Sequence, residues 1–186
     1  LARAGANVLL TDIDRARIFA AAREIRAAGG VARALRVDVR QYAEVERAAA
    51  LAHKTFGRVD LLLNFCGGSP SRVFGRSEPF AQRDPALLEW GIDVNLRGPL
   101  YFCRAVFPRM IESGGGVIVN IGSVDGVTGC GAVEYSAAKS GMDGLTKSLA
   151  IVGAPHGIRA ACVVPGPVLT RPALAKMKTL LGRAAE

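Results

Sequence analysis

Long apolar runs are missing from this sequence of 186 residues. No stretch approaches the roughly 18 consecutive apolar residues that a membrane-spanning helix needs. The opening residues, Leu1 to Asn7, contain no apolar segment of the length found in a signal peptide. These absences predict a cytoplasmic protein that does not contact a membrane.

Cysteine and histidine are also scarce, with 4 and 2 residues respectively. Cys66, Cys103, Cys130 and Cys162 form no Cys-x-x-Cys pair, and no histidine lies near them at the spacing of zinc ligands. We therefore expect reduced, buried thiols and no metal site.

Acidic residues are outnumbered, because 16 Asp and Glu accompany 24 Lys and Arg and give a formal net charge of +8. The basic residues are nevertheless spread along the chain beside acidic ones. Nucleic-acid sites require basic runs interleaved with aromatic residues. The sequence contains no such run, and aromatic residues make up only 6% of it. The composition does not favour nucleic acid as a partner.

The sequence does contain a regular alternation of strand-like and helix-like segments. Apolar runs predict strands over 7–12, 31–37, 59–65, 117–121 and 158–164. Helical spacing covers 15–28, 42–56, 85–111, 135–152 and 172–185, with loops over 66–83 and 122–134. The region 85–111 contains Gly98 and Pro99, which predict a bend. This alternation predicts one α/β domain over 1–186, a doubly wound parallel sheet with helices on both faces.

Polar and glycine-rich clusters follow the predicted strands at their carboxyl ends. In a doubly wound sheet, ligands bind beyond these ends. We therefore expect one edge of the sheet to collect the chemically active groups, which are Asp12, Asp38, Asn64 to Gly68, Ser123 and the Pro165-Gly166 pair.

Tyr135 and Lys139 are four residues apart in a segment that can form a helix, so they share one helical face. A free phenol titrates near pH ~10, and an ammonium about 4 Å away favours its ionised form. The pair therefore suits general acid–base chemistry near neutral pH. Ser123, in the preceding loop, offers a hydroxyl to hold a substrate oxygen. An ordinary surface contact is the alternative interpretation of the pair alone.

Five motifs occur in this order along the chain: Asn-Phe-Cys-Gly, Asp-Val-Asn-Leu-Arg-Gly, Asn-Ile-Gly-Ser, Tyr-Ser-Ala-Ala-Lys and Pro-Gly-Pro-Val-Leu-Thr. Together they resemble the motifs of the classical short-chain dehydrogenase/reductase family. That family uses NAD or NADP on a Rossmann-type fold. The resemblance implies that Tyr135 is the catalytic acid–base, that Lys139 assists it and holds the nicotinamide ribose, and that Ser123 positions the reacting oxygen. Asn95 would support a proton relay to the lysine; by itself it could simply bend a helix.

The resemblance also implies cofactor contacts for Asp12, Asp38 and Val39. A carboxylate at Asp12 can accept both hydroxyls of the adenosine ribose and repels a 2′-phosphate, which favours NAD. Arg15 and Arg17 keep NADP possible. Asp38 and Val39 resemble the Asp-Val pair beside the adenine. Asp12 could instead be a turn or helix-capping residue, and Asp38 could cap the next helix.

Further cofactor contacts are implied around Gly67 and Thr170. Asn64, Cys66 and Gly67 lie where the family has Asn-Asn-Ala-Gly, and the bulky residues at its two middle positions make adenine packing less certain. The segment with Pro165, Gly166, Val168 and Thr170 matches the one that meets the carboxamide end of nicotinamide, although a generic turn is the alternative.

The implied activity is reversible hydride transfer between a nicotinamide and a small-molecule secondary alcohol or ketone. Two alternatives remain at this point: an epimerase or dehydratase on the same scaffold, and a catalytically silent binding module. The resemblance also implies a homodimer or homotetramer, with which apolar residues of two helices are compatible: Leu100, Phe102, Val106, Met142, Leu145 and Leu149.

The glycine-rich phosphate-binding turn and the strand before it are absent. The acidic residue lies about 20 residues after that turn in the family, whereas Asp12 has only eleven residues ahead of it. We interpret the sequence as a fragment that is incomplete at both ends, with 171–186 part of the substrate-binding segment. The missing strand would be the central one, so we expect these residues alone neither to fold robustly nor to hold the cofactor pyrophosphate.

Overall fold

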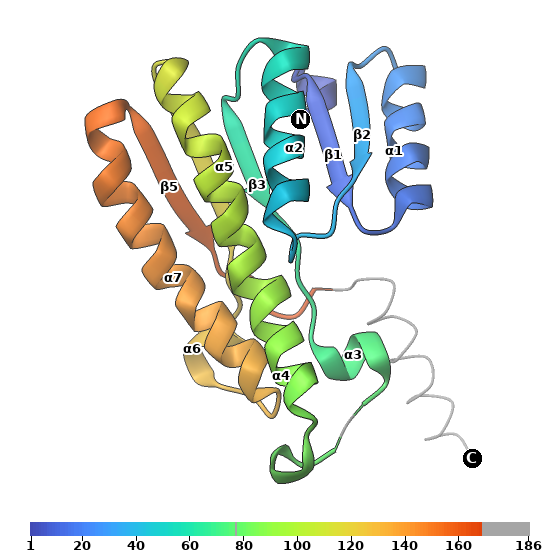
Figure 1. Ribbon diagram of the computed structural model, residues 1–186, viewed down its shortest axis with the longest axis vertical. Coiled ribbons are helices and arrows are strands. Elements are labelled where there is room, and N and C mark those ends of the chain that lie inside the picture. Colours follow the sequence, from blue (N-terminus) through green and yellow to red (C-terminus); the bar gives the residue numbers. More distant parts are fainter. Residues whose placement is uncertain (77, 169–186) are drawn as a thin grey trace.

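Strands and helices alternate along the chain in the computed structural model, which describes residues 1–76 and 78–168 (Figure 1). Each of the five strand predictions is confirmed to within two residues at either end. The strands are β1 (Val8–Asp12), β2 (Ala32–Arg36), β3 (Leu61–Asn64), β4 (Gly116–Ile121) and β5 (Ile158–Val163).

All strand pairs are parallel, which confirms the predicted α/β class. In one sheet β1 pairs with β2, where Val8 lies opposite Ala32. In the other sheet β4 lies between β3 and β5, where Leu61 lies opposite Val117. No ladder joins β1 to β3 among the described residues. The break falls where the sequence predicts the neighbouring strand to be absent.

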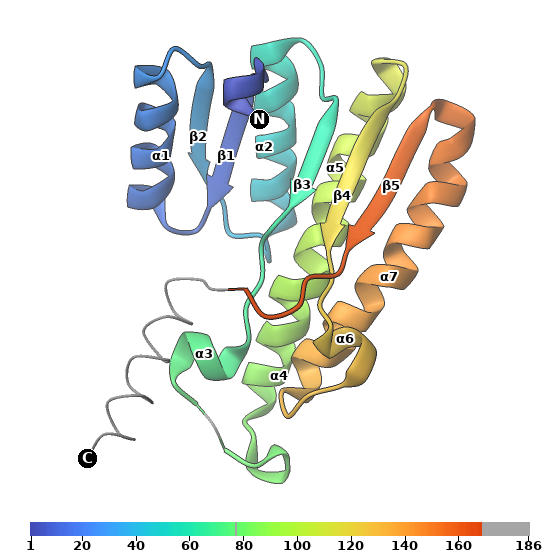
Figure 2. The same ribbon diagram turned by 180° about the vertical axis from the view of Figure 1, so that it is seen from behind.

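In the part of the chain that the structure describes, five helices of eight residues or more connect the strands. They are α1 (Arg15–Ala27), α2 (Tyr42–Phe56), α4 (Pro85–Ile92), α5 (Gly98–Glu112) and α7 (Val133–Gly153). Figures 1 and 2 show α2, α5 and α7 along one face of the strands, and α1 beside β2. Val45 of α2, Met110 of α5 and Ile118 of β4 form part of the core between these layers and are fully buried.

Two short helices lie in segments for which the sequence predicts only loops. They are α3 (Pro70–Phe74) and α6 (Asp125–Thr128), and a 3₁₀ turn at Phe80–Gln82 follows α3. The loop assignment was wrong there because one helical turn contains too few residues to show a periodic pattern. Pro70 at the first turn of α3 is the local signal that favours a helix start. The helix predicted over 172–185 lies outside the described residues.

A π-helical turn over Asp93–Arg97, between α4 and α5, interrupts the long helical region just before the residues that predict a bend. Gly98 donates its backbone N–H to the Asp93 carbonyl, five residues back. Pro99 has no N–H to donate to Asn95, four residues back, so the regular α-helical ladder cannot continue. The turn ends directly before Gly98 and Pro99, and it contains Asn95.

The structure can be compared with three expectations from the composition, which concern the thiols, metal binding and membrane spans. All four cysteines are free, but Cys66 and Cys162 are only half-buried and Cys130 is exposed, so the prediction of buried thiols is confirmed for Cys103 alone. Within 1–76 and 78–168, no group of three or more His, Cys, Asp or Glu side chains is arranged to hold a metal ion. Over the same residues, no helix combines the length and hydropathy of a transmembrane span.

Candidate functional site at the carboxyl edge of the sheet

The strands end at one side of the molecule, where α3, α6 and the segment after β5 emerge (Figures 1 and 2). The segments after β4 and β5 are joined there by backbone hydrogen bonds. The Gly122 N–H donates to the Val163 carbonyl over 2.8 Å, and the Val124 N–H donates to the Pro165 carbonyl over 3.1 Å. The loop that carries Ser123 is therefore fixed to the segment that begins with Pro165.

Helix α7 places Tyr135 and Lys139 on one face, as their spacing predicts. The Lys139 Nζ lies 5.8 Å from the centre of the Tyr135 ring. Lys139 is only 6% exposed, and its ammonium donates a hydrogen bond of 2.7 Å to the carbonyl of Ile121 at the end of β4. The lysine is thus held beneath the carboxyl edge of the sheet and does not extend into solvent.

Burial lowers the pKa of Lys139 below its usual value. Two nearby thiols, Cys66 and Cys162, act in the opposite direction but more weakly. A charge removed from water interacts more strongly with neighbouring groups, because less solvent screens it. The ammonium is therefore well placed to influence a phenol on the same helical face.

Asn95 joins the π-helical turn to the segment that follows β3. Its Nδ2 donates to the carbonyls of Gly91 and Gly68 over 2.8 and 2.9 Å, and its Oδ1 accepts the Gly68 N–H over 2.9 Å. A Cβ at Gly67 would lie 2.7 Å from the Asn95 Oδ1 and 3.2 Å from the Lys139 Nζ. Only glycine at that position therefore permits Asn95 and Lys139 to approach the same backbone segment.

Ser123 lies directly after β4 and begins the turn that leads into α6. Its Oγ accepts the Asp125 N–H over 3.1 Å, which leaves the hydroxyl hydrogen free to be donated. A Cβ at Gly126 of α6 would lie 2.7 Å from backbone atoms of Lys139 and Ser140, so α6 packs directly on α7. This contact holds the Ser123 turn against the helix that carries Tyr135.

Asp12 ends β1 with an exposed side chain, and its Oδ1 accepts the Asp14 N–H over 2.9 Å. The cap of α1 is Asp14, whose side chain accepts the Arg17 N–H. The capping alternative for Asp12 was therefore wrong. A carboxylate that is exposed at a strand end can accept hydrogen bonds from ribose hydroxyls.

Asp38 is buried and bound by Arg40. The Arg40 guanidinium donates to both carboxylate oxygens over 2.6 to 3.2 Å. The hydrogen bond from Arg40 holds the pKa of Asp38 below its usual range, although burial opposes this shift. Gln41, not Asp38, is the residue before α2, so the capping alternative for Asp38 was also wrong. Val39 packs so closely on Gly98 that a Cβ there would lie 2.7 Å from its Cγ2.

Asn64 belongs to a buried chain of polar side chains that the sequence analysis did not identify. Its Nδ2 donates to the Asn120 Oδ1 over 2.8 Å, and the Asn120 Nδ2 donates to the Thr146 Oγ1 over 2.9 Å. The detectable signal was an asparagine in the middle of the apolar run of β4. Because the Asn64 amide is bonded inside the protein, its predicted cofactor contact would have to use backbone atoms.

Cys66 follows β3 and is half-buried. Burial raises the pKa of its thiol to about 11; Asp12 and, more weakly, Asp38 also raise it, and Lys139 lowers it. The thiol therefore stays protonated at neutral pH. The cofactor contact predicted for Cys66 remains a prediction.

The remaining predicted cofactor residues lie in the last described segment. Pro165 is partly buried through its contact with the β4 loop, while Gly166 and Val168 are exposed. Thr170 and the substrate-binding segment predicted over 171–186 lie outside the described residues.

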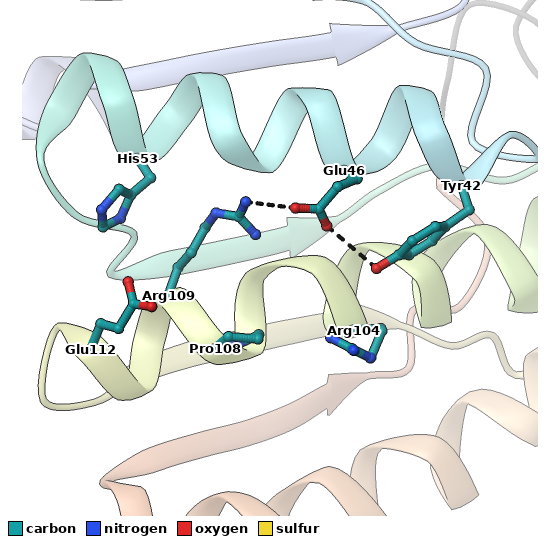
Figure 3. A pocket seen from close by; sticks show the side chains of 7 residues that line it. All are labelled: Tyr42, Glu46, His53, Arg104, Pro108, Arg109 and Glu112. Carbon is teal, nitrogen blue, oxygen red and sulfur yellow. Dashed lines mark hydrogen bonds and ion pairs between the residues drawn. The ribbon is translucent and has the colours of Figure 1, made fainter.

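A surface hollow of about 470 Å³ lies elsewhere, between α2 and α5 (Figure 3). The Arg109 Nη2 donates to the Glu46 Oε1 over 2.6 Å, and the Tyr42 hydroxyl donates to the Glu46 Oε2 over 3.3 Å. The Arg109–Glu46 bond links α5 to α2 across the hollow, whereas the Tyr42–Glu46 bond lies within α2. None of the predicted site residues lines the hollow. It supplies a well-separated place for control substitutions.

The residues considered for an oligomer interface are divided between core and surface. Val106 and Met142 are buried within the chain, while Leu100 is 44% exposed. Phe102 and Leu149 pack on the core. The monomer's own core thus explains most of these apolar positions, and an oligomer remains an expectation.

The chain can now be compared with known proteins. A family model described as short chain dehydrogenase matches residues 1–179. The chain belongs to the short-chain dehydrogenase family. The resemblance of the five motifs is thereby confirmed at the level of the family.

Three similar proteins show how much of each chain is shared. Oxidoreductase UcpA of Salmonella typhimurium is 37% identical over 171 residues, which cover 91% of this chain and 62% of that protein. A 7 alpha-hydroxysteroid dehydrogenase, solved with NADH and 7-oxo glycochenodeoxycholic acid, is 28% identical with a TM-score of 0.85 over 94% of this chain and 66% of that one. A metagenomic short-chain oxidoreductase, solved with NADP, is 33% identical with a TM-score of 0.82 over 97% and 80%. The chain spans about three fifths of the length of the curated relative.

Proposed function

We propose that this chain forms the catalytic part of an NAD(P)-dependent oxidoreductase that interconverts a secondary alcohol and a ketone. The observation that carries the proposal is the buried Lys139 ammonium 5.8 Å from the Tyr135 ring, on one face of α7. Family membership and the nicotinamide cofactors of two solved relatives support it.

The residues at the carboxyl edge fit a nicotinamide cofactor. Gly67 lies against Asn95 and Lys139 with no space for a side chain, so the backbone is open to close approach by a ligand on its other side. The exposed Asp12 carboxylate can accept both hydroxyls of the adenosine ribose, and we propose NAD as the preferred cofactor for this reason. Val39 and Pro165 would border its adenine and nicotinamide ends.

When bound, the nicotinamide supplies or accepts the hydride. The protein's residues hold the substrate oxygen and move one proton. In reduction, Ser123 donates a hydrogen bond to the carbonyl oxygen and Tyr135 donates its proton to it. Lys139 favours the resulting phenolate by its charge. Asn95 keeps Gly68 and α4 in place, through the three hydrogen bonds that its amide makes.

The experiment is a Tyr135→Phe substitution in the natural polypeptide that contains this chain. Absorbance of NADH and NADPH at 340 nm is followed with a panel of ketones and β-keto esters. We expect kcat to fall by about 10²- to 10⁴-fold, the range for loss of a general acid–base, while NADH binding by fluorescence is retained. Tyr42→Phe, in the hollow between α2 and α5, is the matched control and should keep wild-type activity.

Two outcomes would contradict the proposal. A Tyr135→Phe variant that reduces ketones at the wild-type rate would show that the phenol is not the proton donor. A wild-type protein that binds NADH but turns over no carbonyl compound would instead favour a transient use of nicotinamide, as in an epimerase or dehydratase, or a binding module.

A further inference from the structure

A buried ion pair joins the start of α7 to the segment before α4. The Arg83 Nη1 lies 2.7 Å from the Glu134 Oε2, and the two side chains are 8% and 2% exposed. Glu134 is the residue immediately before Tyr135. The pair therefore acts at the first turn of the helix that carries the proposed acid–base.

The pair also reaches the element that carries Asn95. A Cβ at Gly91 of α4 would lie 2.4 Å from the Glu134 Cγ, so α4 lies against this side chain and only glycine fits there. The carbonyl of the same glycine accepts the hydrogen bond from Asn95 Nδ2. Glu134 thus packs on Gly91, whose carbonyl binds Asn95, and it directly precedes Tyr135 in the chain.

The other end of the pair is anchored in the segment between α3 and α4. The Arg83 Nη2 donates to the Glu78 carbonyl over 3.2 Å, and the Arg83 N–H donates to the Phe80 carbonyl over 3.1 Å. Figure 1 shows this segment beyond the carboxyl ends of the strands, on the same side as α6. One guanidinium therefore links a segment of the catalytic edge to the catalytic helix.

Stability alone does not account for this arrangement. The second carboxylate oxygen, Glu134 Oε1, is buried and has no hydrogen-bond partner among the described residues. A buried ion pair with an unsatisfied oxygen costs desolvation free energy, and apolar residues of similar volume would often stabilise a protein as well or better. Such a pair does, however, define direction and distance, which apolar contacts do not. The first turn of α7 also lacks a side-chain cap, since Ala132 precedes it.

We infer that Arg83 and Glu134 are positioning residues, which fix the first turn of α7 against α4 so that Tyr135 and Asn95 keep their relative placement during turnover. The inference rests on the proposed function of Tyr135. Neither residue contacts the reacting atoms in this role; they act through the helices that they join.

The test compares two double variants of the natural polypeptide. Arg83→Met with Glu134→Met replaces the pair by apolar residues of similar length. Asp143→Asn with Lys147→Met removes an exposed ion pair of the same helix α7 and is the matched control. Assays use ethyl acetoacetate, or the panel compound with the highest wild-type turnover, at saturating NADH. Melting temperature and NADH binding are measured in parallel.

For the Arg83/Glu134 double variant we expect an unchanged or higher melting temperature, a kcat about tenfold lower, and a KM for NADH within twofold of wild type. The control double variant should match wild type in all three. Arg83→Lys keeps the positive charge beside Glu134, so its loss of kcat should be smaller than that of the double variant. Some loss is still expected, because a lysine cannot bind the Glu134 carboxylate and the Glu78 carbonyl with two separate nitrogens.

The inference is overturned if the apolar double variant folds and keeps kcat within twofold of wild type. It is also overturned if both this variant and Arg83→Lys fail to fold, because the pair would then serve stability. Tyr135→Phe, measured alongside, separates the two proposals: unchanged activity there refutes the acid–base assignment, whereas a large loss there with no loss in the pair variants refutes only the positioning role.

Discussion

The two sheets of this protein present their polar groups in different ways. Around β3, β4 and β5, several polar side chains are buried and hydrogen-bonded within the protein: Asn95 and Asn120 are fully buried, and Lys139 is 6% exposed. Around β1 and β2, Asp38 is buried against Arg40, whereas Asp12 is exposed and makes one local hydrogen bond. This difference fits the proposed function, in which Lys139 and Asn95 keep a fixed geometry for proton transfer and Asp12 meets a mobile ligand.

Lys139→Met is expected to have the largest effect, because it removes the buried charge beside Tyr135 on which the proposed proton transfer depends. Activity should fall by about 10³-fold. The free energy of unfolding should rise by about 1 kcal/mol, as happens where function opposes stability. Steady-state kinetics and thermal unfolding of the same samples provide the check.

The pH dependence of that stability difference has a definite sign. Burial lowers the folded-state pKa of Lys139 below 10.5, so the unfolded chain binds more protons between the two values. Wild-type stability should therefore rise with pH over this interval, and the advantage of Lys139→Met should shrink. A gap that widens toward pH 10 would contradict the burial of a charged lysine.

Asn120→Leu should show the next largest effect, because the Asn120 side chain joins buried polar groups around β3, β4 and α7. The change leaves the Asn64 amide with its weaker Cys103 contact and removes the donor to Thr146. A loss of about 3 kcal/mol in the free energy of unfolding is expected from two under-satisfied buried groups. Urea unfolding measures it, and Asp60→Asn, at an exposed site, should leave stability within about 0.5 kcal/mol of wild type.

Asp12→Ser tests the open side of the comparison. It should reduce the preference for NADH over NADPH by about 10- to 100-fold, since one charge-assisted contact to ribose is worth roughly 1.5 to 3 kcal/mol. Its melting temperature should stay close to wild type, because the carboxylate is exposed. The ratio of kcat/KM for the two cofactors is the readout. A preference for NADPH in the wild type would show that Arg15 or Arg17 dominates instead.

Asp38→Asn is expected to have the smallest effect. Arg40 lowers the folded-state pKa of Asp38, so the ion pair adds stability above the unfolded value of about 3.9 and this stability is lost as pH falls through the folded value. Because the Arg40 side chain is 36% exposed, solvent limits the loss to about 1 kcal/mol at pH 7. The difference from wild type should vanish near pH 2 in chemical unfolding.

Much of the fold and part of the site could be predicted from local pattern. The strand and helix positions follow from the apolar periodicity, and the shared face of Tyr135 and Lys139 follows from their spacing of four. The capping alternatives for Asp12 and Asp38 could not be decided, because the sequence does not show which nearby residue binds the first N–H groups of a helix. Asp14 caps α1, and the Asp38 carboxylate binds Arg40 while Gln41 precedes α2.

The sequence by itself determined the order of the elements, the edge at which chemistry is possible, and the family. Tertiary structure alone decided that Glu134 meets Arg83 across 51 residues, that Asn120 completes a chain from Asn64 to Thr146, and that Gly67 lies against Lys139. The physical reason is that periodicity reports which face of an element is buried. It does not report which distant polar group satisfies a buried partner, since that depends on how the helices are packed.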